Sequence, residues 1–306
     1  MKKLFAIAIM ALSVAAQAAP ASDAPAADCE GVKVATGPKG KGYSTLFADI
    51  NKLIGSKVAL CEVNTTGGLD NLNALSTKDA DIGIVQIDTW NDMKGGDDNI
   101  AALQAVMPLN SNYLHIVTSV NGVVGEKKFG LLKGDTKVIN RFSDLRGQRV
   151  ALVGSAQLLG RKLEKSVGYG MQFIDVKTDA DGFAMVKSGQ VAAVLTVSGW
   201  PSGTVKQLSQ ADGLTLVPFD APIGEPYKVK ALNYKNIAVY NNNSLAIQNV
   251  LVSRAFTGQR AANVAAIQAG ITRNLTELKE GNYQPAWNEV NPNAAVANMT
   301  KFKAGK

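Results

Sequence analysis

The sequence has very little histidine and cysteine. Its 306 residues include one histidine, His115, and two cysteines, Cys29 and Cys61. Metal centres and catalytic triads take most of their ligands and bases from these residue types. The sequence also has no Gly-x-Ser-x-Gly elbow and no His-Glu-x-x-His pair. We therefore expect no catalytic residue, no metal site, no cofactor and no enzymatic activity.

A long apolar run is missing everywhere after residue 16, so we expect no transmembrane helix. The first residues, MKKLFAIAIMALSVAAQAAP, combine Lys2 and Lys3 with an apolar run over 4–16 and the small-residue pattern Ala16-Gln17-Ala18. This pattern is typical of a cleavable secretory signal, and the run is too short to span a bilayer. We expect a signal peptide over 1–18, a flexible leader over 19–28 and a periplasmic mature protein.

A strong charge of one sign is also missing. The net charge of +7 falls to +5 once Lys2 and Lys3 are removed, and the remaining Lys and Arg are scattered. Nucleic-acid-binding proteins instead concentrate basic residues in a patch or stripe. We therefore expect no nucleic-acid partner and a mild preference for anions. The roughly 288 mature residues exceed what one core usually serves, which favours two lobes.

The two cysteines form a pair in an exported chain. An even cysteine count in that compartment favours a disulfide. Cys29 precedes the first expected strand and Cys61 lies in the second, so neighbouring strands can bring them together. The alternative is two buried thiols.

Strands and helices alternate along the first part of the chain. Short β-rich runs at 32–36, 58–63 and 82–86 are separated by helical patterns over 43–54 and 69–75. Leu46, Phe47, Ile50, Leu53 and Ile54 share one face of the first helix. This order predicts an α/β fold with a parallel sheet.

The same pattern restarts after residue 119. Apolar runs at 101–107 and 113–120 lead into it. Strands are expected at 149–153, 191–197 and 214–218. Helices are expected from 157, near 180–188 and near 203–211. The tail reads as a strand at 236–240 followed by helices over 247–280. We expect one lobe formed by 29–118 and 226–306, and a second, hinged lobe over 119–225.

Polar groups follow the strands of the first lobe, where an open parallel sheet binds its ligands. After the first strand come Thr36, Gly42, Tyr43 and Ser44, at the start of a helix whose free N–H groups favour an anion. In the purely structural alternative, Ser44 or Thr45 only caps the helix. We expect Lys39 and Lys41 in this loop to be solvated rather than bound to ligand.

The next two strand ends carry similar groups. We expect ligand contacts from the turn residues Thr65, Thr66, Gly67 and Gly68, although Thr66 would also serve as an N-cap. Gln86 can both donate and accept hydrogen bonds. Asp88 either caps the following helix or binds the ammonium group of an amino acid.

The second lobe supplies further candidates at its own turns, Ser155, Gln157, Ser198, Gly199 and Trp200. These residues would close onto a ligand, and Trp200 would act as a lid or pack between the lobes. We expect His115, in the apolar run YLHIVTS, to be a hydrogen-bonded structural residue.

One motif imitates a dinucleotide-binding fingerprint. Gly40-x-Gly42 follows a strand and precedes a helix, and Glu62 lies about 20 residues on. Thr45 takes the place of the third glycine, however, and Pro38 stiffens the turn. An exported protein also has poor access to NAD, so this reading is set aside.

The ordered set of motifs resembles the TAXI solute receptors of tripartite ATP-independent periplasmic (TRAP) transporters. The matching stretches span most of the mature chain: VATGPKGKGYSTLFADINKLI (34–54), VNTTGGLDNLNALSTKDADIGIVQID (63–88), HIV (115–117), FSDLRGQRVALVGS (142–155) and VAAVLTVSGWP (191–201). The sequence departs from the family in its first loop, GPKGKGY, which has one aromatic residue, and in its second-lobe turn, GSAQ.

The resemblance implies a type II periplasmic-binding-protein fold, the two-lobe Venus flytrap, without catalysis. It further implies capture of a small organic acid or amino acid for integral-membrane transporter subunits. Separately, we expect the protein to be a monomer. Because both divergent loops would face the ligand, the ligand itself is not implied. Two alternatives remain open: service to an ABC importer or a sensor, and a periplasmic adaptor that binds no ligand.

Overall fold

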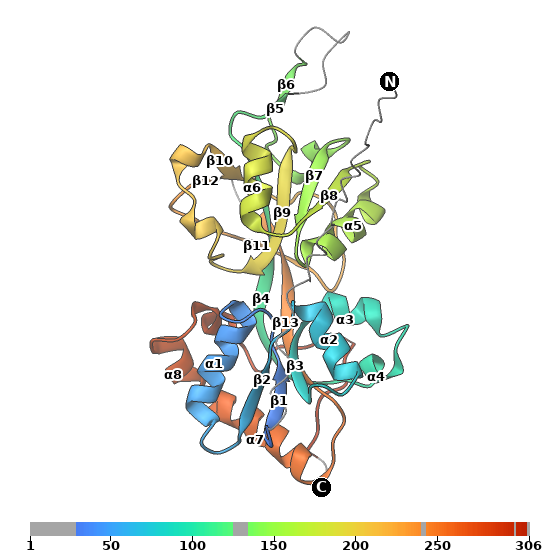
Figure 1. Ribbon diagram of the computed structural model, residues 1–306, viewed down its shortest axis with the longest axis vertical. Helices are drawn as coiled ribbons and strands as arrows, with labels where there is room; N and C mark the ends of the chain where they lie inside the picture. Colours follow the sequence, from blue (N-terminus) through green and yellow to red (C-terminus); the bar gives the residue numbers. More distant parts are fainter. Residues whose placement is uncertain (1–28, 125–133, 240–242, 297, 305–306) are drawn as a thin grey trace, which may run out of the picture.

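Two long antiparallel strands form the spine of the structure. The computed structural model describes residues 29–124, 134–239, 243–296 and 298–304. Strand β4 (Gln104–Ser119) pairs with strand β13 (Asn243–Ser253), and both run from one lobe to the other (Figure 1). Three parallel strands continue the sheet on each side, in the order β2-β1-β3-β13-β4-β9-β7-β8. The predicted α/β class is therefore confirmed.

The lower lobe in Figure 1 contains the N-terminal βα units and the C-terminal helices. Its elements are β1 (Val32–Ala35), α1 (Gly42–Ile54), β2 (Leu60–Val63), α2 (Gly68–Ser76), β3 (Ile82–Gln86), α3 (Ile87–Met93), α4 (Asp98–Ala101), α7 (Gly258–Arg273), α8 (Leu275–Glu280) and the 3₁₀ helix η4 (Pro285–Glu289). Strand β1 pairs in parallel with β2 and β3.

The upper lobe repeats this plan with the middle of the chain. Its elements are β7 (Arg149–Val153), α5 (Ala156–Val167), β8 (Gln172–Val176), α6 (Asp179–Lys187), β9 (Ala193–Gly199), β10 (Leu214–Leu216), β11 (Lys228–Ala231), β12 (Ala238–Val239), the hairpin strands β5 (Val123–Val124) and β6 (Thr136–Lys137), and the 3₁₀ helices η1 (Phe142–Leu145), η2 (Val205–Gln207) and η3 (Gln210–Asp212). Strand β7 pairs in parallel with β8 and β9.

Helices cover both faces of the sheet in each lobe. The predicted apolar face of α1, with Leu46, Phe47 and Ile50, packs on the sheet together with Val264 of α7. Helices α2 and α3 bury their apolar residues on the opposite face. In the upper lobe, α5 and α6 belong to separate apolar clusters in the same way. Each lobe is thus a three-layer unit with a core on either side of its sheet.

Residues that follow the expected lobe boundary at 226 pack with the upper lobe. Leu232, Tyr234 and Ile237 pack in the same apolar cluster as Phe183 of the upper lobe. The expected lobe bounds stay a prediction, and this packing favours a crossing along β13 rather than at residue 226.

Two secondary-structure predictions were wrong, and two apolar runs without an assigned element turned out to be one strand. The two apolar runs at 101–107 and 113–120 form the single strand β4, which accommodates Pro108 where its pairing with β13 shifts register. Such an irregularity tolerates a residue without an N–H group. The tail expected to be helical from 247 begins as strand β13, and 203–211 forms the short 3₁₀ helices η2 and η3.

The predicted disulfide between Cys29 and Cys61 is present, with 6.2 Å between the two Cα atoms. The disulfide ties the segment before β1 to strand β2. Strands β1 and β2 are parallel neighbours in the sheet. Within the described ranges, no helix has the length and apolarity needed to cross a membrane. The predicted signal peptide and leader lie outside the described residues.

Candidate functional site

The carboxyl ends of the strands from both lobes converge on the middle of the spine. Gln86, the last residue of β3, pairs with Asn249 of β13. From the other side, Gly199, the last residue of β9, pairs with Asn112 of β4. Strand β3 runs antiparallel to β13 and β9 runs antiparallel to β4, so the two sets of strand ends point toward each other. Ligands of open α/β sheets bind at such ends.

A buried hydrogen-bond cluster occupies this convergence point. The Tyr43 hydroxyl donates to Asn249 Oδ1 (2.8 Å) and accepts from Asn112 Nδ2 (3.0 Å). Asn249 Nδ2 in turn donates to Asn112 Oδ1 (3.1 Å) and Asn110 Oδ1 (3.3 Å). Burial raises the pKa of Tyr43, so its hydroxyl stays protonated and able to donate. The cluster joins α1 to both strands of the spine.

The first loop and the second turn lie against each other. A Cβ added at Gly37 would lie 3.8 Å from the Cα of Gly67, and both glycines have positive φ values near +145° that other residues rarely adopt. Asn71 Nδ2 locks the two segments to the sheet by donating to the carbonyls of Thr36 (2.8 Å) and Ile84 (2.7 Å). Asn64 Nδ2 donates to the Gly37 carbonyl (3.2 Å).

The threonines of these two segments are engaged in local structure. The Thr36 hydroxyl donates to Glu62 Oε1 (2.9 Å), and the Thr65 hydroxyl donates to Asn71 Oδ1 (2.6 Å). The Thr66 hydroxyl bonds the Asp70 carboxylate in the first turn of α2. The geometry thus gives these hydroxyls a role in holding the turns.

Neither helix that starts here has a side-chain cap. The N-cap residues are Lys41 for α1 and Gly67 for α2, so the alternative in which Ser44, Thr45 or Thr66 is the N-cap is wrong. Ser44 instead accepts from the Gly40 N–H (3.0 Å) and closes the loop. Helix α1 also has no acidic residue in its first turn, and Lys39 and Lys41 are exposed beside it. Uncapped N–H groups and the positive end of the helix dipole favour an anion.

Gln86 lies at the centre of these elements. A Cβ added at Gly68 would lie 3.7 Å from the Gln86 backbone N and 3.9 Å from its Oε1, so the turn and the strand end are in contact. Gln86 is 3% exposed. We define the strand-end cluster as the residues that this geometry joins: Gly37, Tyr43, Gly67, Gly68, Gln86, Asn110, Asn112, Gly199 and Asn249.

Asp88 belongs to a different contact. It lies in the first turn of α3, where Gln86 is the N-cap, so the predicted capping role for Asp88 is wrong. One carboxylate oxygen accepts from the Thr89 N–H (2.8 Å) and the other from the Tyr227 hydroxyl (3.2 Å). Burial raises the pKa of Asp88. Nearby, Lys162 of α5 pairs with Asp92 of α3 (2.8 Å), so this side of the molecule bridges the lobes.

The upper-lobe candidates are only partly brought to the cluster. Gly199 is part of it, since a Cβ there would lie 3.8 Å from Asn110 Nδ2. Ser155 and Gln157 lie at the turn after β7, one strand further from the spine, and Ser155 is exposed. Trp200 packs against the upper-lobe core, and its buried indole N–H has no hydrogen-bond partner among the described residues.

His115 is a buried structural residue. Its Nε2 lies 2.8 Å from the Tyr234 hydroxyl, and its Nδ1 lies 3.0 Å from the Tyr113 carbonyl and 3.4 Å from the Ser198 hydroxyl. Burial lowers its pKa to about 4. The ring is therefore neutral at physiological pH, as expected for a hydrogen-bonded core histidine.

Sequence reasoning missed Asn110, Asn112, Asn249 and Tyr227. The three asparagines interrupt otherwise apolar stretches, PLNSNYLHIV and LAIQNVLV. Because buried polar side chains need partners, polar residues inside an apolar strand are a usable signal. Their mutual pairing depends on the strand register, which the sequence does not reveal.

Comparison with solved structures defines the class of fold. An ancestral arginine-binding protein bound to arginine is similar over 86% of this chain and 99% of its own, with a TM-score of 0.50 and 16% identity. The amino acid ABC transporter substrate-binding protein AbpA from Streptococcus pneumoniae, bound to L-arginine, matches 84% of this chain and 94% of its own, with a TM-score of 0.51 and 12% identity. The predicted fold, a Venus flytrap of the periplasmic-binding-protein type, is confirmed.

The chain belongs to the NMT1-like family, which matches residues 34–255. The match begins in β1 and ends just after β13, so it includes every member of the strand-end cluster.

Proposed function

We propose that this protein is a periplasmic solute-binding receptor that captures a small organic anion or amino acid at the strand-end cluster. The observation that carries the proposal is the convergence of strand ends from both lobes on two uncapped helix N-termini. The similar structures of an arginine-binding protein and of AbpA support a receptor rather than an enzyme. The sequence and the fold therefore favour the same class of function.

The carboxylate of the ligand is the group that this site is best suited to bind. Backbone N–H groups of Gly42, Tyr43, Ser44 and Gly68 in the first turns of α1 and α2 supply donors, and the helix dipoles supply positive potential. Gln86 adds an amide that can donate or accept. The strand-end cluster contains no carboxylate, and Asp88 is engaged by Tyr227, so an anionic ligand end is favoured over a cationic one.

The other predicted contacts depend on lobe closure. In the proposed cycle the upper lobe, with Ser155, Gln157 and Ser198 at its strand ends, closes onto the ligand. A ligand shifts the lobes toward the closed state only by its tighter binding to that state. Thr36, Thr65 and Thr66 would act by holding the loops in shape.

For the membrane partner we propose a TRAP-type transporter, because the ordered motifs resemble TAXI receptors. An ABC importer fits the structural neighbours equally well, since AbpA serves that class. Uptake of the identified ligand in cells that lack the adjacent permease genes separates the two. If uptake depends on a permease that has no ATPase subunit, the partner is TRAP-type. If uptake depends on an ATPase subunit, the partner is an ABC importer.

Thermal unfolding of the mature protein against a panel of amino acids and small mono- and dicarboxylates tests the receptor proposal. A micromolar ligand at about 1 mM adds about 4 kcal/mol to the free energy of unfolding. For a chain of this size the midpoint rises by on the order of 10 °C. No shift across the panel, with protein shown by mass spectrometry to be free of bound ligand, would instead favour the adaptor alternative.

A pair of substitutions at Gly68 tests the site. A Cβ at this position meets Gln86 at ordinary contact distances of 3.7 and 3.9 Å, so Gly68→Ala fits. Gly68→Val adds two methyl groups between α2 and Gln86. We expect Gly68→Val to abolish binding while its unfolding midpoint stays close to that of Gly68→Ala. Unchanged ligand affinity in Gly68→Val would remove this turn from the site.

A further inference from the structure

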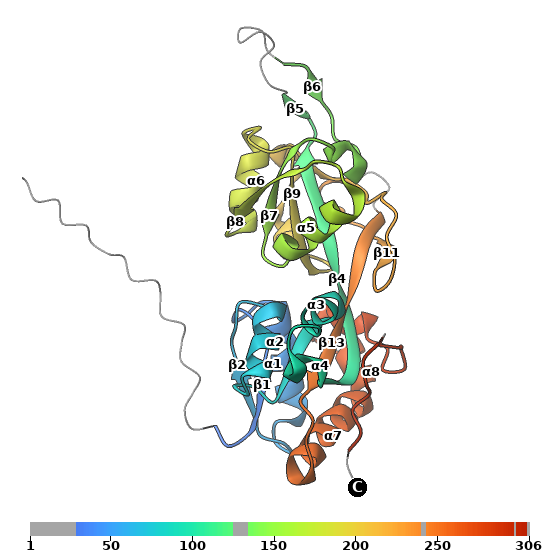
Figure 2. The same cartoon turned by 90° about the vertical axis from the view of Figure 1, so that its right-hand side faces the viewer.

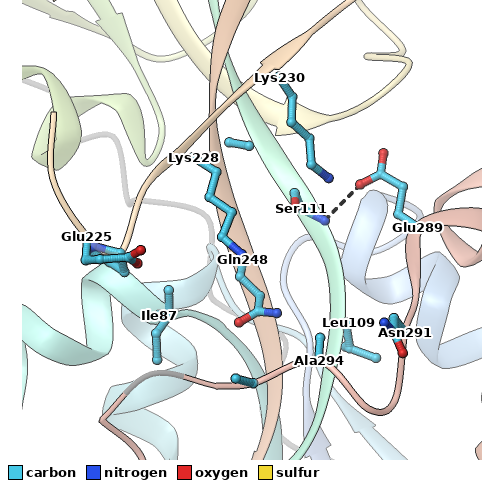
Figure 3. Close-up of a pocket in the computed structure, with 13 residues that line it drawn as sticks. Ile87, Leu109, Ser111, Glu225, Lys228, Lys230, Gln248, Glu289, Asn291 and Ala294 are labelled. Atoms are coloured by element: carbon cyan, nitrogen blue, oxygen red, sulfur yellow. Dashed lines mark hydrogen bonds between the residues drawn. The ribbon is translucent and has the colours of Figure 1, made fainter. Parts of the chain in front are cut away.

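A cavity lies between the lobes, on the side of the spine away from the strand-end cluster. It has a volume of about 170 Å³ and is lined by residues of both lobes (Figure 3). The polar lining residues are Ser111, Glu225, Lys228, Lys230, Gln248, Glu289 and Asn291. Figure 2 shows β11 and α8 on one side of β4 and β13, and α1 and α2 on the other.

Strand alternation separates this cavity from the strand-end cluster. Successive side chains of a strand point to opposite faces of the sheet. Asn112 and Asn249 belong to the strand-end cluster, whereas their neighbours Ser111 and Gln248 line the cavity and pair directly across the spine. The two sites therefore share the same strands and use opposite faces of them.

Two lysines give the cavity its positive side. Lys228 and Lys230 are two residues apart on β11, so both side chains project to the same face, and both residues are exposed. Lys230 Nζ lies 3.5 Å from the Tyr113 hydroxyl, and within the described ranges Lys228 has no ion pair. Figure 3 shows both side chains directed into the cavity.

Two acidic residues also line the cavity, and they balance the formal charge of the two lysines. Glu289 Oε2 accepts from the Ser111 N–H (3.1 Å) and from the Tyr113 hydroxyl (2.8 Å), which fixes the position of this carboxylate and leaves its negative charge in place. Glu225 is exposed and lies at the far side of the cavity from Glu289 (Figure 3). The amide of Gln248 lies between the two glutamates, below Lys228, and the amide of Asn291 lies below Glu289 (Figure 3).

We propose that this cavity is a binding site for a small carboxylate, held by Lys228 and Lys230 with help from Gln248 and Asn291. The volume of 170 Å³ is more than ten times the roughly 15 Å³ needed for one water, and is below the roughly 300 Å³ of pockets for drug-sized ligands. A compact acid of a few carbons therefore fits the site better than a large ligand. Ammonium groups pair with carboxylates through charge-assisted hydrogen bonds.

The position of the cavity couples it to the movement of the lobes. Its lysines are on β11 beside the upper lobe, and Glu289 and Asn291 follow α8 in the lower lobe. A carboxylate that bridges the two sets stabilises one angle between them. The two sites are then coupled reciprocally. A carboxylate in the cavity changes the affinity of the strand-end cluster for its ligand, and that ligand changes the affinity of the cavity for the carboxylate by the same factor.

Calorimetric titration of malonate into the mature protein at low salt tests the site. The wild type is compared with Lys228→Gln/Lys230→Gln, with Lys206→Gln as an exposed lysine outside the cavity, and with Gly68→Val. We expect the double variant to bind at least about tenfold more weakly, since charge-assisted contacts are lost. We expect Lys206→Gln to bind as the wild type does, and Gly68→Val to keep the binding event that the double variant loses. Uncharged malonamide should bind far more weakly than malonate.

Several outcomes would overturn the proposal. Equal malonate affinity in the wild type and the double variant would exclude the two lysines. Loss of all malonate binding in Gly68→Val would place the ligand at the strand-end cluster instead. Absence of saturable binding, or equal binding of malonamide, would also refute a carboxylate site. A second binding event that Gly68→Val removes and the double variant keeps would support two separate sites.

Discussion

The buried cluster around Tyr43 makes a quantitative prediction about stability. Tyr43→Phe removes one donated and one accepted hydrogen bond and leaves Asn249 Oδ1 and Asn112 Nδ2 without this partner. Asn249 is 0% exposed and Asn112 is 9% exposed, so water cannot readily replace the hydroxyl. Each buried group left unsatisfied costs about 1–3 kcal/mol, and relaxation of the asparagine amides recovers part of it. We expect the free energy of unfolding to fall by about 2–3 kcal/mol.

Urea unfolding followed by circular dichroism measures this loss, with Tyr283→Phe as the matched control. The Tyr283 hydroxyl donates to Glu277 at an exposed position, so its removal should cost less than about 0.5 kcal/mol. A double-mutant cycle with Asn249→Leu should show a coupling energy of about 0.5–3 kcal/mol. If Tyr43→Phe is no more destabilising than Tyr283→Phe, the cluster does not hold α1 to the spine as we infer.

Two further predictions follow from the disulfide and from the single histidine. Because the disulfide closes a loop with a sequence separation of 32, Cys29→Ser/Cys61→Ser should lower the free energy of unfolding by about 3–4 kcal/mol at most. An unfolding midpoint equal to that of the oxidised wild type would contradict this prediction. His115 has a pKa lowered to about 4 by burial, so its NMR signals should not titrate between pH 8 and 5, and a midpoint near the ordinary value of about 6.5 would refute its burial. The unfolded state binds this proton more tightly, so the contribution of His115 is fully present above about pH 6.5 and declines as the pH falls toward 4.

The sequence predicted the lower lobe well because its signals are local. The apolar spacing of Leu46, Phe47 and Ile50 places α1, and glycine-rich turns mark the strand ends on either side of it. The loops at 36–44 and 65–68 and Gln86 were chosen by the same reasoning, and the fold does bring Tyr43, Gly67, Gly68 and Gln86 together.

The rest depended on long-range pairing. The residues of β13 form a short apolar run whose periodicity does not separate a strand from a helix. Only pairing with β3 and β4 decides the matter. For the same reason Asn112 and Asn249, which are 137 residues apart, gave no sign of their contact. The partner of Asp88, Tyr227, likewise lies in a distant segment, so the local sequence does not reveal their hydrogen bond.

The spine also fixes the order in which the chain can complete its fold. Strand β3, whose residues are all buried, has β1 on one side and β13 on the other, so its second edge stays open until residues 249–253 are available. An apolar strand with an open edge is a template for association with other chains. Contacts between such distant segments form slowly. We therefore expect refolding to be slow and sensitive to protein concentration, because the open edge of β3 is exposed until β13 pairs with it.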